Sequence, residues 1–282
     1  MTALQAIILA IVQGITELFP ISSLGHAVIM PALLGWKIDE NSPDFLPFLV
    51  VMHLGTAIAL LIYFWRDWLD FATAVLIRRG PKAQAERRLF WRVVIATLPA
   101  VIIGFLLEKH LKQIFGAPLI AAGFLIANGV MLFVAERWRG RAERRLDQMR
   151  WFDAVLIGLW QCLALIPGLS RSGATMAGGY LIGLDHEDAA RFSFLTATPI
   201  ILGATVLEAP KLMHHGGAHT FGAVAILAGV VAGVVAFASV ALLMRWFRGH
   251  ETRGFDPFAI YCWIAGAGSI GWLLLHGARL TG

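Results

Sequence analysis

The most reactive side chains of the sequence lie in two short motifs that are far apart in the chain. The first motif, QGITELFPISSLGH, contains Glu17, Ser23 and His26, and the second, PGLSRSGAT, begins at Pro167 and contains Arg171. A carboxylate, a hydroxyl and an imidazole can transfer protons or attack phosphorus, and a forked guanidinium binds phosphate oxygens. Together, the two motifs predict a site for a phosphorylated ligand.

Arg171 is surrounded by residues that favour anion binding. Ser170 and Ser172 place a hydroxyl on either side of it, and Gly168 and Gly173 leave room for backbone N–H groups to converge on one ligand. Phosphate is the anion that suits this combination of donors best.

Glu17 and Arg171 are the charges that the sequence places deepest in apolar surroundings. A charge there is costly unless it is paired or hydrated, which makes both residues candidates for function. A purely structural ion pair between them is the simpler alternative. His26 also has two interpretations, because a lone histidine often caps a helix, whereas beside Ser23 it can serve as general acid or base. His53, in a later apolar segment, faces either this site or the helix bundle.

The first motif also contains part of a metal site. Gln13 and Glu17 are four residues apart, so a continuous helix places both side chains on one face. They can hold a divalent cation or a water molecule. One carboxylate and one amide are too few ligands for a hard cation, so a bound phosphate has to supply the remaining oxygens, as is common for Mg²⁺. We therefore expect cation binding to depend on the substrate.

The elements that position these motifs are predicted to be membrane helices. The chain has 282 residues, of which 58% are apolar and 15% charged, against roughly 25% charged residues in soluble domains. Apolar runs near the ~20 residues that cross a bilayer indicate six spans. These are residues 45–65, 92–108, 118–135, 192–209, 221–244 and 257–276. We predict an all-α polytopic membrane protein.

Basic residues indicate how the spans are oriented. Of the 23 Lys and Arg residues, 16 fall in three clusters, with seven in residues 66–92, six in residues 137–150 and three in residues 245–253. Such clusters mark cytoplasmic loops. All three share the cytoplasm only if residues 152–183, which PGLSRSG interrupts, dip into the membrane and return. The net charge of +5 is then explained by these loops, and nucleic acid is excluded as a partner.

Residues 2–36 are interrupted in the same way, by FPISSLGH, and resemble residues 152–183. Each half of this single membrane domain, residues 1–150 and residues 151–282, then holds one re-entrant helix pair and three spans. Because three is an odd number, the second half is inverted relative to the first, unless the similarity arises by chance. In inverted-topology repeats, broken helices from opposite sides meet near the midplane and form a site, often for an anion.

The two motifs resemble those of the undecaprenyl-diphosphate phosphatase family, also described as bacitracin-resistance proteins, and the resemblance covers essentially the whole chain. The family's first motif is Glu or Gln, three residues and Glu, followed by P-x-S-S-x-G-H, and its second is P-G-x-S-R-S-x-x-T. The matching residues are Gln13, Glu17, Pro20, Ser22, Ser23, Gly25 and His26, then Pro167, Gly168, Ser170, Arg171, Ser172 and Thr175. Because Gln13 cannot be an ionised ligand, Glu17 has to carry most of any metal-binding role.

The resemblance implies a bacterial inner-membrane enzyme that hydrolyses undecaprenyl diphosphate to undecaprenyl phosphate and inorganic phosphate. Such an enzyme recycles the lipid carrier of cell-wall synthesis and confers bacitracin resistance. The resemblance also implies inverted repeats with two re-entrant helix pairs, dependence on a divalent cation, and an active site that opens to the periplasm.

For this chain, the resemblance implies that Arg171 and neighbouring hydroxyls hold the diphosphate. The hydroxyls are those of Ser22, Ser170, Ser172 and Thr175. Glu17, helped by Gln13, is expected to position Mg²⁺ or Ca²⁺. Either Ser23 attacks phosphorus with His26 as its base, or a water molecule attacks and His26 protonates the leaving phosphate. The sequence leaves both routes open.

A transporter or flippase of a phosphorylated polyprenyl lipid is the competing function, because crossed broken helices are typical of secondary carriers. A carrier needs no acid/base pair such as His26 and Ser23, which favours the enzyme, and a protein that both hydrolyses and carries the lipid is a third interpretation. The expected partners are the lipid bilayer and the polyprenyl diphosphate, and a homodimer is left open. Cys162 and Cys262 lack the spacing of a zinc site or a disulfide framework.

Overall fold

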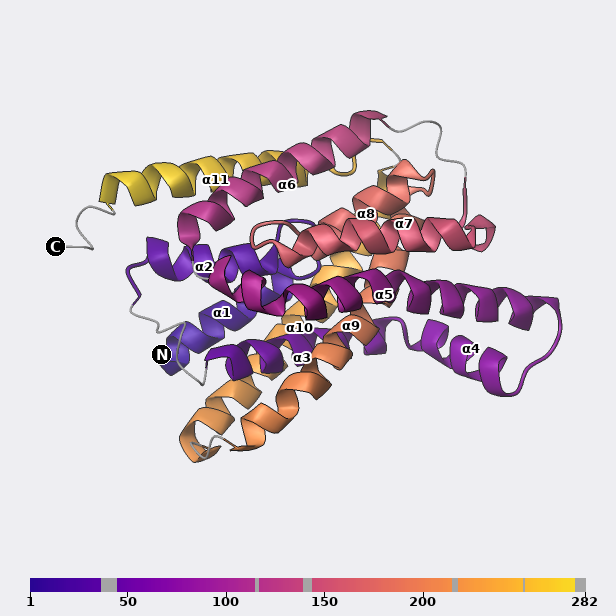
Figure 1. The fold of residues 1–282 in the computed structure, drawn as a ribbon, viewed down its shortest axis with the longest axis horizontal. Helices are drawn as coiled ribbons and strands as arrows, with labels where there is room; N and C mark the ends of the chain where they lie inside the picture. Colours follow the sequence, from indigo (N-terminus) through magenta and orange to yellow (C-terminus); the bar gives the residue numbers. More distant parts are fainter. Residues whose placement is uncertain (37–44, 115–116, 139–143, 215–217, 251, 277–282) are drawn as a thin grey trace.

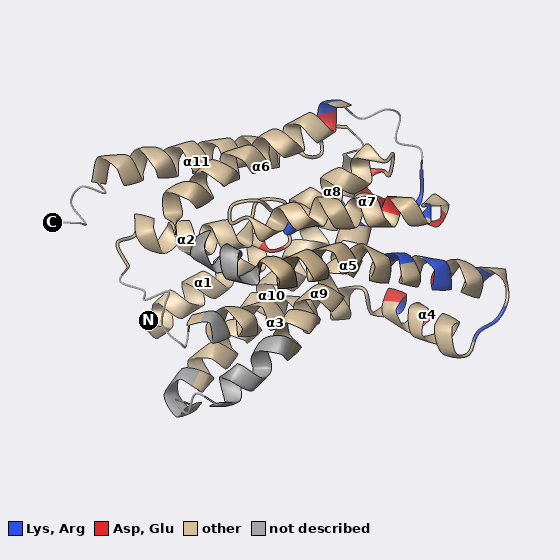
Figure 2. Cartoon of the chain, viewed as in Figure 1, with Lys and Arg blue, Asp and Glu red and all other residues tan. Residues whose placement is uncertain are grey.

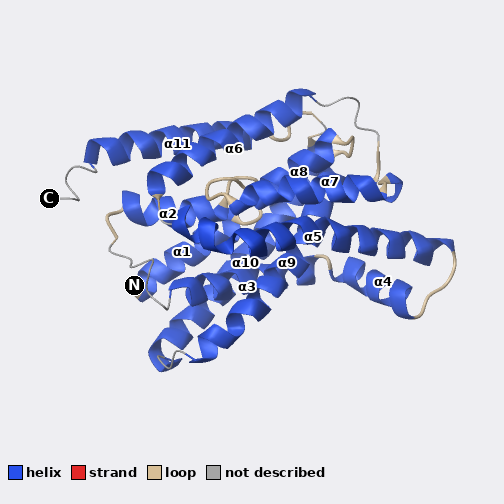
Figure 3. Cartoon of the chain, in the orientation of Figure 1, coloured by secondary structure: helices blue, strands red, loops and turns tan. Residues whose placement is uncertain are grey.

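The computed structural model describes residues 1–36, 45–114, 117–138, 144–214, 218–250 and 252–276. Within these ranges the chain is helical and forms no strand (Figure 3). The α-helices are α1 Ala3–Thr16, α2 Ser23–Leu33, α3 Phe45–Tyr63, α4 Trp65–Leu76, α5 Pro81–Ile114, α6 Pro118–Trp138, α7 Trp151–Gln161, α8 Arg171–Leu181, α9 His186–His214, α10 Ala218–Gly249 and α11 Asp256–His276, and two 3-10 turns are η1 Leu146–Gln148 and η2 Cys162–Leu165.

Within the described residues, six segments are long and apolar enough to cross a membrane when one bent pair of helices is taken as a single span. Five are single helices, α5, α6, α9, α10 and α11, and the sixth is α3 together with α4, which are bent by 74° relative to each other. These segments agree with the six predicted spans, and the protein is a multi-pass helical membrane protein. Several of these helices extend beyond the apolar runs. Their polar end residues continue the helical backbone hydrogen bonds, and a hydropathy pattern does not include such residues.

Two pairs of shorter helices enclose the interruptions that the sequence indicated. Residues 17–22 separate α1 from α2, and residues 166–170 separate η2 from α8. Each second helix begins with a serine cap, since Ser22 accepts a hydrogen bond from the Gly25 N–H and Ser170 accepts one from the Gly173 N–H. We refer to residues 17–22 as the first break and to residues 166–170 as the second break.

Long helices from the other half of the chain surround each break. Helix α1 packs against α10, and α7 packs against α5, while α6 lies beside α11 and contacts both α2 and α8 (Figure 1). Where α3 crosses α10 the backbones are in close contact, because a Cβ atom on Gly55 would overlap the Gly229 carbonyl group. Small residues permit such approaches between membrane helices.

Charged residues are concentrated at one end of the helices. Figure 2 shows Lys and Arg on α4, on the first part of α5 and just before α7, all at the same end of the molecule. Ion pairs there connect neighbouring segments, such as Arg144 with Asp153 at 2.5 Å and Arg137 with Asp256. The middle of the bundle is almost free of charge in this view, which makes the charged residues of the two breaks exceptional.

Candidate active site

The two predicted motifs meet where the breaks face each other. Glu17 is the C-cap of α1, and Arg171 is the first residue of α8. The Nη2 atom of Arg171 lies 2.8 Å from Oε1 of Glu17, and the two side chains are 14% and 6% exposed. The expected proximity of Glu17 and Arg171 is therefore confirmed in geometry, across 154 residues of sequence.

Glu17 is also bound by the first motif and by a third helix. Its Oε2 atom accepts hydrogen bonds from Ser23 Oγ at 2.6 Å and from Gln13 Nε2 at 3.1 Å. The Nε2 atom of His53, on α3, lies 3.4 Å from the same oxygen. His53 thus faces the site and not only the bundle, which answers the question that its sequence position left open.

Arg171 retains unused hydrogen-bonding capacity. Its Nη1 atom is buried and has no partner among the residues that the structure describes. The flanking serines have their Oγ atoms 3.0 Å apart, Ser170 to Ser172, and Ser172 donates to the carbonyl of Phe19, 3.1 Å away in the first break. A buried donor without a partner is costly. An anion at the N-terminus of α8 would satisfy it.

Ser22 connects the two breaks through a strained turn. It has a φ of 69°, a region that non-glycine residues rarely adopt. Its hydroxyl accepts from the Gly25 N–H and donates to the carbonyl of Leu169, 3.3 Å away in the second break. The structure therefore places Ser22 at the junction of the breaks, with its hydroxyl already engaged.

Thr175 is the predicted site residue that lies apart from this group. It is one turn inside α8, and its hydroxyl donates to the Arg171 carbonyl at 2.5 Å and lies 2.7 Å from Ser193 Oγ on α9. These contacts direct the hydroxyl toward α9. They fix α8 against its neighbour and do not add a donor beside Glu17.

His26 faces a different partner from the one expected. Its Nδ1 atom is 2.7 Å from the Ser22 carbonyl, and its Nε2 atom is 2.7 Å from the hydroxyl of Tyr261 on α11. A carbonyl can only accept, so Nδ1 carries the proton and Nε2 accepts from Tyr261. Among the described residues, no hydrogen bond joins His26 to Ser23, whose hydroxyl donates to Glu17 instead.

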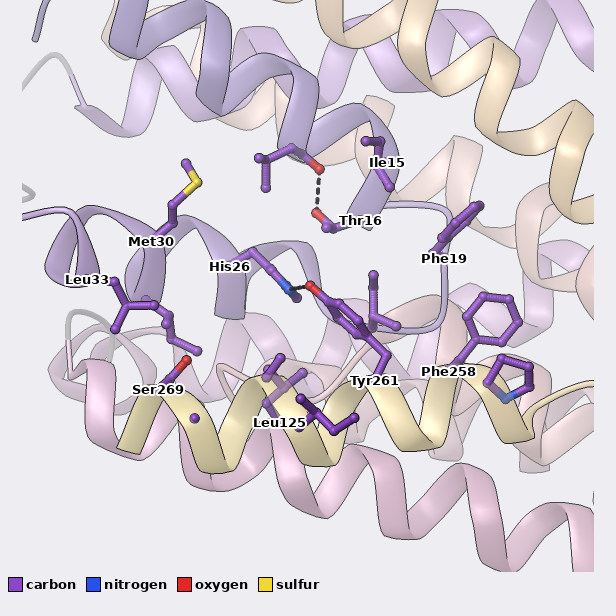
Figure 4. A pocket seen from close by; sticks show the side chains of 17 residues that line it. Ile15, Thr16, Phe19, His26, Met30, Leu33, Leu125, Phe258, Tyr261 and Ser269 are labelled. Carbon is purple, nitrogen blue, oxygen red and sulfur yellow. Dashed lines mark hydrogen bonds between the residues drawn. The ribbon is translucent and has the colours of Figure 1, made fainter. Parts of the chain in front are cut away.

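An apolar groove lies beside His26. It has a volume of about 760 Å³ and runs between α1, α2 and α11 (Figure 4). Ile15, Met30, Leu33 and Tyr261 are among the side chains that line it. The Phe19 ring lines this groove as well, while its carbonyl accepts from Ser172 on the other side. The first break is thus a thin wall between the groove and the polar centre.

The residues of the site provide only part of a metal-binding set. Within the described part of the chain, no three His, Cys, Asp or Glu side chains are grouped closely enough to hold a metal ion. Glu17 offers a carboxylate that is already hydrogen-bonded, and Gln13 donates its amide N–H, which leaves its oxygen available. A cation fits here only if a bound phosphate completes the ligand set.

Two residues of the site were not identified from the sequence. Tyr261 lies near the start of a span, where tyrosine is typically an interfacial anchor, so no signal distinguished it. Asn128, on α6, contacts both breaks. An amide inside an otherwise apolar span was a usable signal, because polar side chains within a membrane often mark function.

Comparisons with known proteins agree with the motifs. The family described as bacitracin resistance protein BacA matches residues 6–268. A protein named undecaprenyl-diphosphatase from Acidiphilium cryptum (strain JF-5) is 55% identical over 276 residues, which cover 96% of this chain and 98% of that protein. Proteins of the same name from Granulibacter bethesdensis and Gluconobacter oxydans are 53% and 52% identical, over 97% and 94% of this chain and 97% of each relative.

Proposed function

The chain belongs to the bacitracin resistance protein BacA family, and on this basis we propose that it hydrolyses undecaprenyl diphosphate to undecaprenyl phosphate and inorganic phosphate. The observation that carries the proposal is the state of Arg171. Its Nη2 atom is held by Glu17, and its Nη1 atom is buried without a partner in the described part of the chain. A terminal phosphate fits this arrangement, because it brings several acceptor oxygens and negative charge.

The chemical step is phosphoryl transfer. Ser23 Oγ attacks the terminal phosphorus as its proton passes to Glu17, 2.6 Å away. The P–O bond to the bridging oxygen breaks, and undecaprenyl phosphate leaves. Arg171 stabilises the charge on the equatorial oxygens during transfer. Water then hydrolyses the phosphoserine and releases inorganic phosphate. The Ser23–Glu17 hydrogen bond supports this route over direct attack by water.

His26 acts on the leaving group. Its Nε2 atom accepts from Tyr261 and borders the groove, so it is placed on the side from which the lipid arrives. When that nitrogen is protonated, it can donate to the bridging oxygen as the P–O bond breaks. Tyr261 holds the ring in this orientation until the diphosphate takes its place.

A divalent cation, Mg²⁺ or Ca²⁺, completes the site when the substrate is bound. Glu17 and Gln13 would hold it together with phosphate oxygens, since these two side chains alone are too few ligands. When bound, the cation neutralises charge on the diphosphate.

The apolar groove receives the first isoprene units of the lipid. Its walls are formed almost entirely by hydrocarbon side chains, and its volume of about 760 Å³ lies within the range of small-molecule sites. Phe19 lines the groove, and its carbonyl accepts a hydrogen bond from Ser172, the residue after Arg171. A polyprenyl diphosphate can therefore place its tail in the groove and its phosphates between the breaks.

The two halves of the chain form inverted repeats, each with a re-entrant pair and three spans. The matching contacts of α1 with α10 and of α7 with α5 support this arrangement. We place the basic end in the cytoplasm of a bacterial inner membrane and the site open to the periplasm. There the enzyme recycles the lipid carrier of cell-wall synthesis and confers bacitracin resistance.

Phosphate release from undecaprenyl diphosphate by the purified protein in detergent tests this function. We expect release that EDTA abolishes and that falls about 1,000-fold in two variants. Glu17→Ala loses the acceptor for the Ser23 proton, and Arg171→Ala loses the positive charge that stabilises the transition state. A folded wild-type protein that releases no phosphate would instead favour a carrier of the lipid, since broken helices that meet inside a bundle also suit transport.

A further inference from the structure

Asn128 connects the two breaks through a single side chain. Its Nδ2 atom donates to the Pro20 carbonyl in the first break at 2.8 Å, and its Oδ1 atom accepts from the Ser170 N–H in the second break at 2.9 Å. The residue is 0% exposed and lies in the middle of α6. Its remaining contact is with Cys262 Sγ on α11, at 3.4 Å.

The two bonds are made to backbone groups that the breaks leave unpaired. Pro20 and Ser170 lie outside helices, so their carbonyl and N–H groups have no place in a helical ladder. Away from water, such groups need a side-chain partner. A carboxamide has a donor and an acceptor on the same rigid plane. Asn128 can therefore satisfy both groups and set the spacing between them.

These backbone positions are adjacent to the groups that bind the substrate. Ser170 caps α8 and precedes Arg171, while Pro20 lies in the loop between Glu17 and Ser23. A shift of either backbone would carry these side chains with it. A direct bond between the breaks, from the Ser22 hydroxyl to the Leu169 carbonyl, attaches neither break to α6.

We propose that Asn128 is a positioning residue that fixes the distance between the first break, which leads into Ser23, and the second break, which leads into Arg171, by bonding to both from α6. The kinetic effect of this role rests on the proposed phosphatase function. Asn128 touches neither phosphate nor lipid. It acts through Ser170 and Pro20, and displacements near 1 Å at a transfer site cost about 100-fold in rate.

The test compares four proteins: wild type, Asn128→Leu, Asn128→Asp and Cys262→Ala. Asn128→Leu has nearly the same shape and loses both bonds, whereas Asn128→Asp keeps only the acceptor for Ser170. Cys262→Ala removes the third contact and keeps both bonds from Asn128 to the breaks. Leu132→Ala, one turn further along α6 and buried in the core, supplies a variant that is destabilised without any change at the breaks.

The measurements are kcat and KM for the lipid, the affinity for inorganic diphosphate with Mg²⁺, and thermal melting. For Asn128→Leu we expect kcat to fall about 100-fold, with a weakening of diphosphate binding limited to about tenfold. Asn128→Asp should lie between it and wild type. Cys262→Ala should keep wild-type kinetics. Leu132→Ala should melt at a lower temperature, with kcat and KM unchanged.

The outcomes separate this proposal from the function on which it rests. Wild-type kcat in folded Asn128→Leu, or an equal loss in Leu132→Ala at the same drop in melting temperature, overturns the positioning role. If Asn128→Leu does not fold, unchanged kinetics in Asn128→Asp also overturns the positioning role. If the wild type binds diphosphate but releases no phosphate, the phosphatase function fails. Weaker diphosphate binding by Asn128→Leu would then still support the positioning role.

Discussion

Residues 17–22 and residues 166–170 interrupt similar pairs of short helices, yet they place different groups in the centre of the molecule. The first break offers side chains, among them Glu17, and it also forms a wall of the apolar groove. The second break offers backbone and leads directly into Arg171 at the start of α8. No residue of the second break lines the groove among those described.

The backbones of the two breaks turn by different means. Gly168 has a φ of 100° in the second break, and Ser22 has a φ of 69° in the first. A Cβ atom on Gly168 would overlap the Ala121 carbonyl oxygen and lie 2.7 Å from Phe124 Cβ. The second break therefore packs its backbone tightly on α6, whereas the first is strained at Ser22, whose hydroxyl accepts one hydrogen bond and donates another.

Gly168→Ala tests the tight packing of the second break and should have the largest effect. The added methyl group overlaps α6 and the φ value is unfavourable for alanine. We expect a loss of about 3 kcal/mol or more in unfolding free energy, with little active protein recovered. Thermal melting in detergent measures the loss of stability, and the yield of purified protein measures the recovery.

Gly35→Ala is the matched control for Gly168→Ala. Gly35 also has a positive φ, 62°, but a Cβ atom there would meet open space. Gly35→Ala should lower the unfolding free energy by only about 1 kcal/mol, from backbone strain alone. Equal losses in the two variants would contradict the view that close approach to α6 sets the second break apart.

Arg171→Lys tests the charge that directly follows the second break. A lysine keeps the charge but has no planar fork, so it cannot hold Glu17 through one N–H and a phosphate through another. We expect kcat/KM to fall about 100-fold, or about 2.7 kcal/mol, while the protein still folds. Phosphate release under subsaturating lipid measures this loss.

Arg191→Lys provides the comparison for Arg171→Lys. Arg191 pairs with Asp67 and is 38% exposed. Its substitution should leave kcat/KM within about twofold, because exposed ion pairs contribute little. Wild-type activity in Arg171→Lys would mean that a positive charge alone is enough for catalysis. The hypothesis that the guanidinium binds Glu17 and phosphate through separate N–H groups would then be wrong.

Gly268→Leu tests the groove that only the first break borders. Gly268 lines the groove, and a Cβ atom added there meets no atom within 4 Å. The leucine should occupy space needed by the tail without disturbing the fold. We expect kcat/KM for undecaprenyl diphosphate to fall about tenfold, or about 1.4 kcal/mol, with a smaller loss for a short-chain isoprenoid diphosphate.

Gly271→Leu is the control for the groove. Gly271 is on the same helix and has equally open space, but it does not line the groove. It should leave the ratio of long-chain to short-chain kcat/KM unchanged. If the ratio shifts equally in both variants, the hypothesis that this groove binds the lipid tail is wrong.

The sequence predicted the helical class and the placement of the two breaks, because both depend on local composition. Long apolar runs identify spans, and a charged or Pro/Gly-rich interruption identifies a break. The contact between Glu17 and Arg171 was predictable for the same reason, since two costly charges in an apolar medium need a partner.

What the sequence did not reveal depends on helix rotation and on contacts between distant helices. His53 was left undecided because nothing local fixes which face of α3 meets Glu17. The His26–Tyr261 bond joins residues 235 apart in the sequence. The Thr175 hydroxyl was expected at the diphosphate, but its place within α8 turns it toward Ser193. Such directions follow from the packing of the whole bundle.

Ser22→Gly should have the smallest effect, and it tests whether the first break is truly strained. Glycine relieves the positive φ, worth about 1 kcal/mol, but loses the cap and the bond to the Leu169 carbonyl, worth about the same. The two changes nearly cancel, so unfolding free energy should change by less than about 1 kcal/mol. Ser22→Ala keeps the strain and loses the hydroxyl, so it should melt below Ser22→Gly. If the alanine variant is as stable as the glycine variant, the turn at Ser22 is not strained, and the two breaks differ only in the side chains that they present.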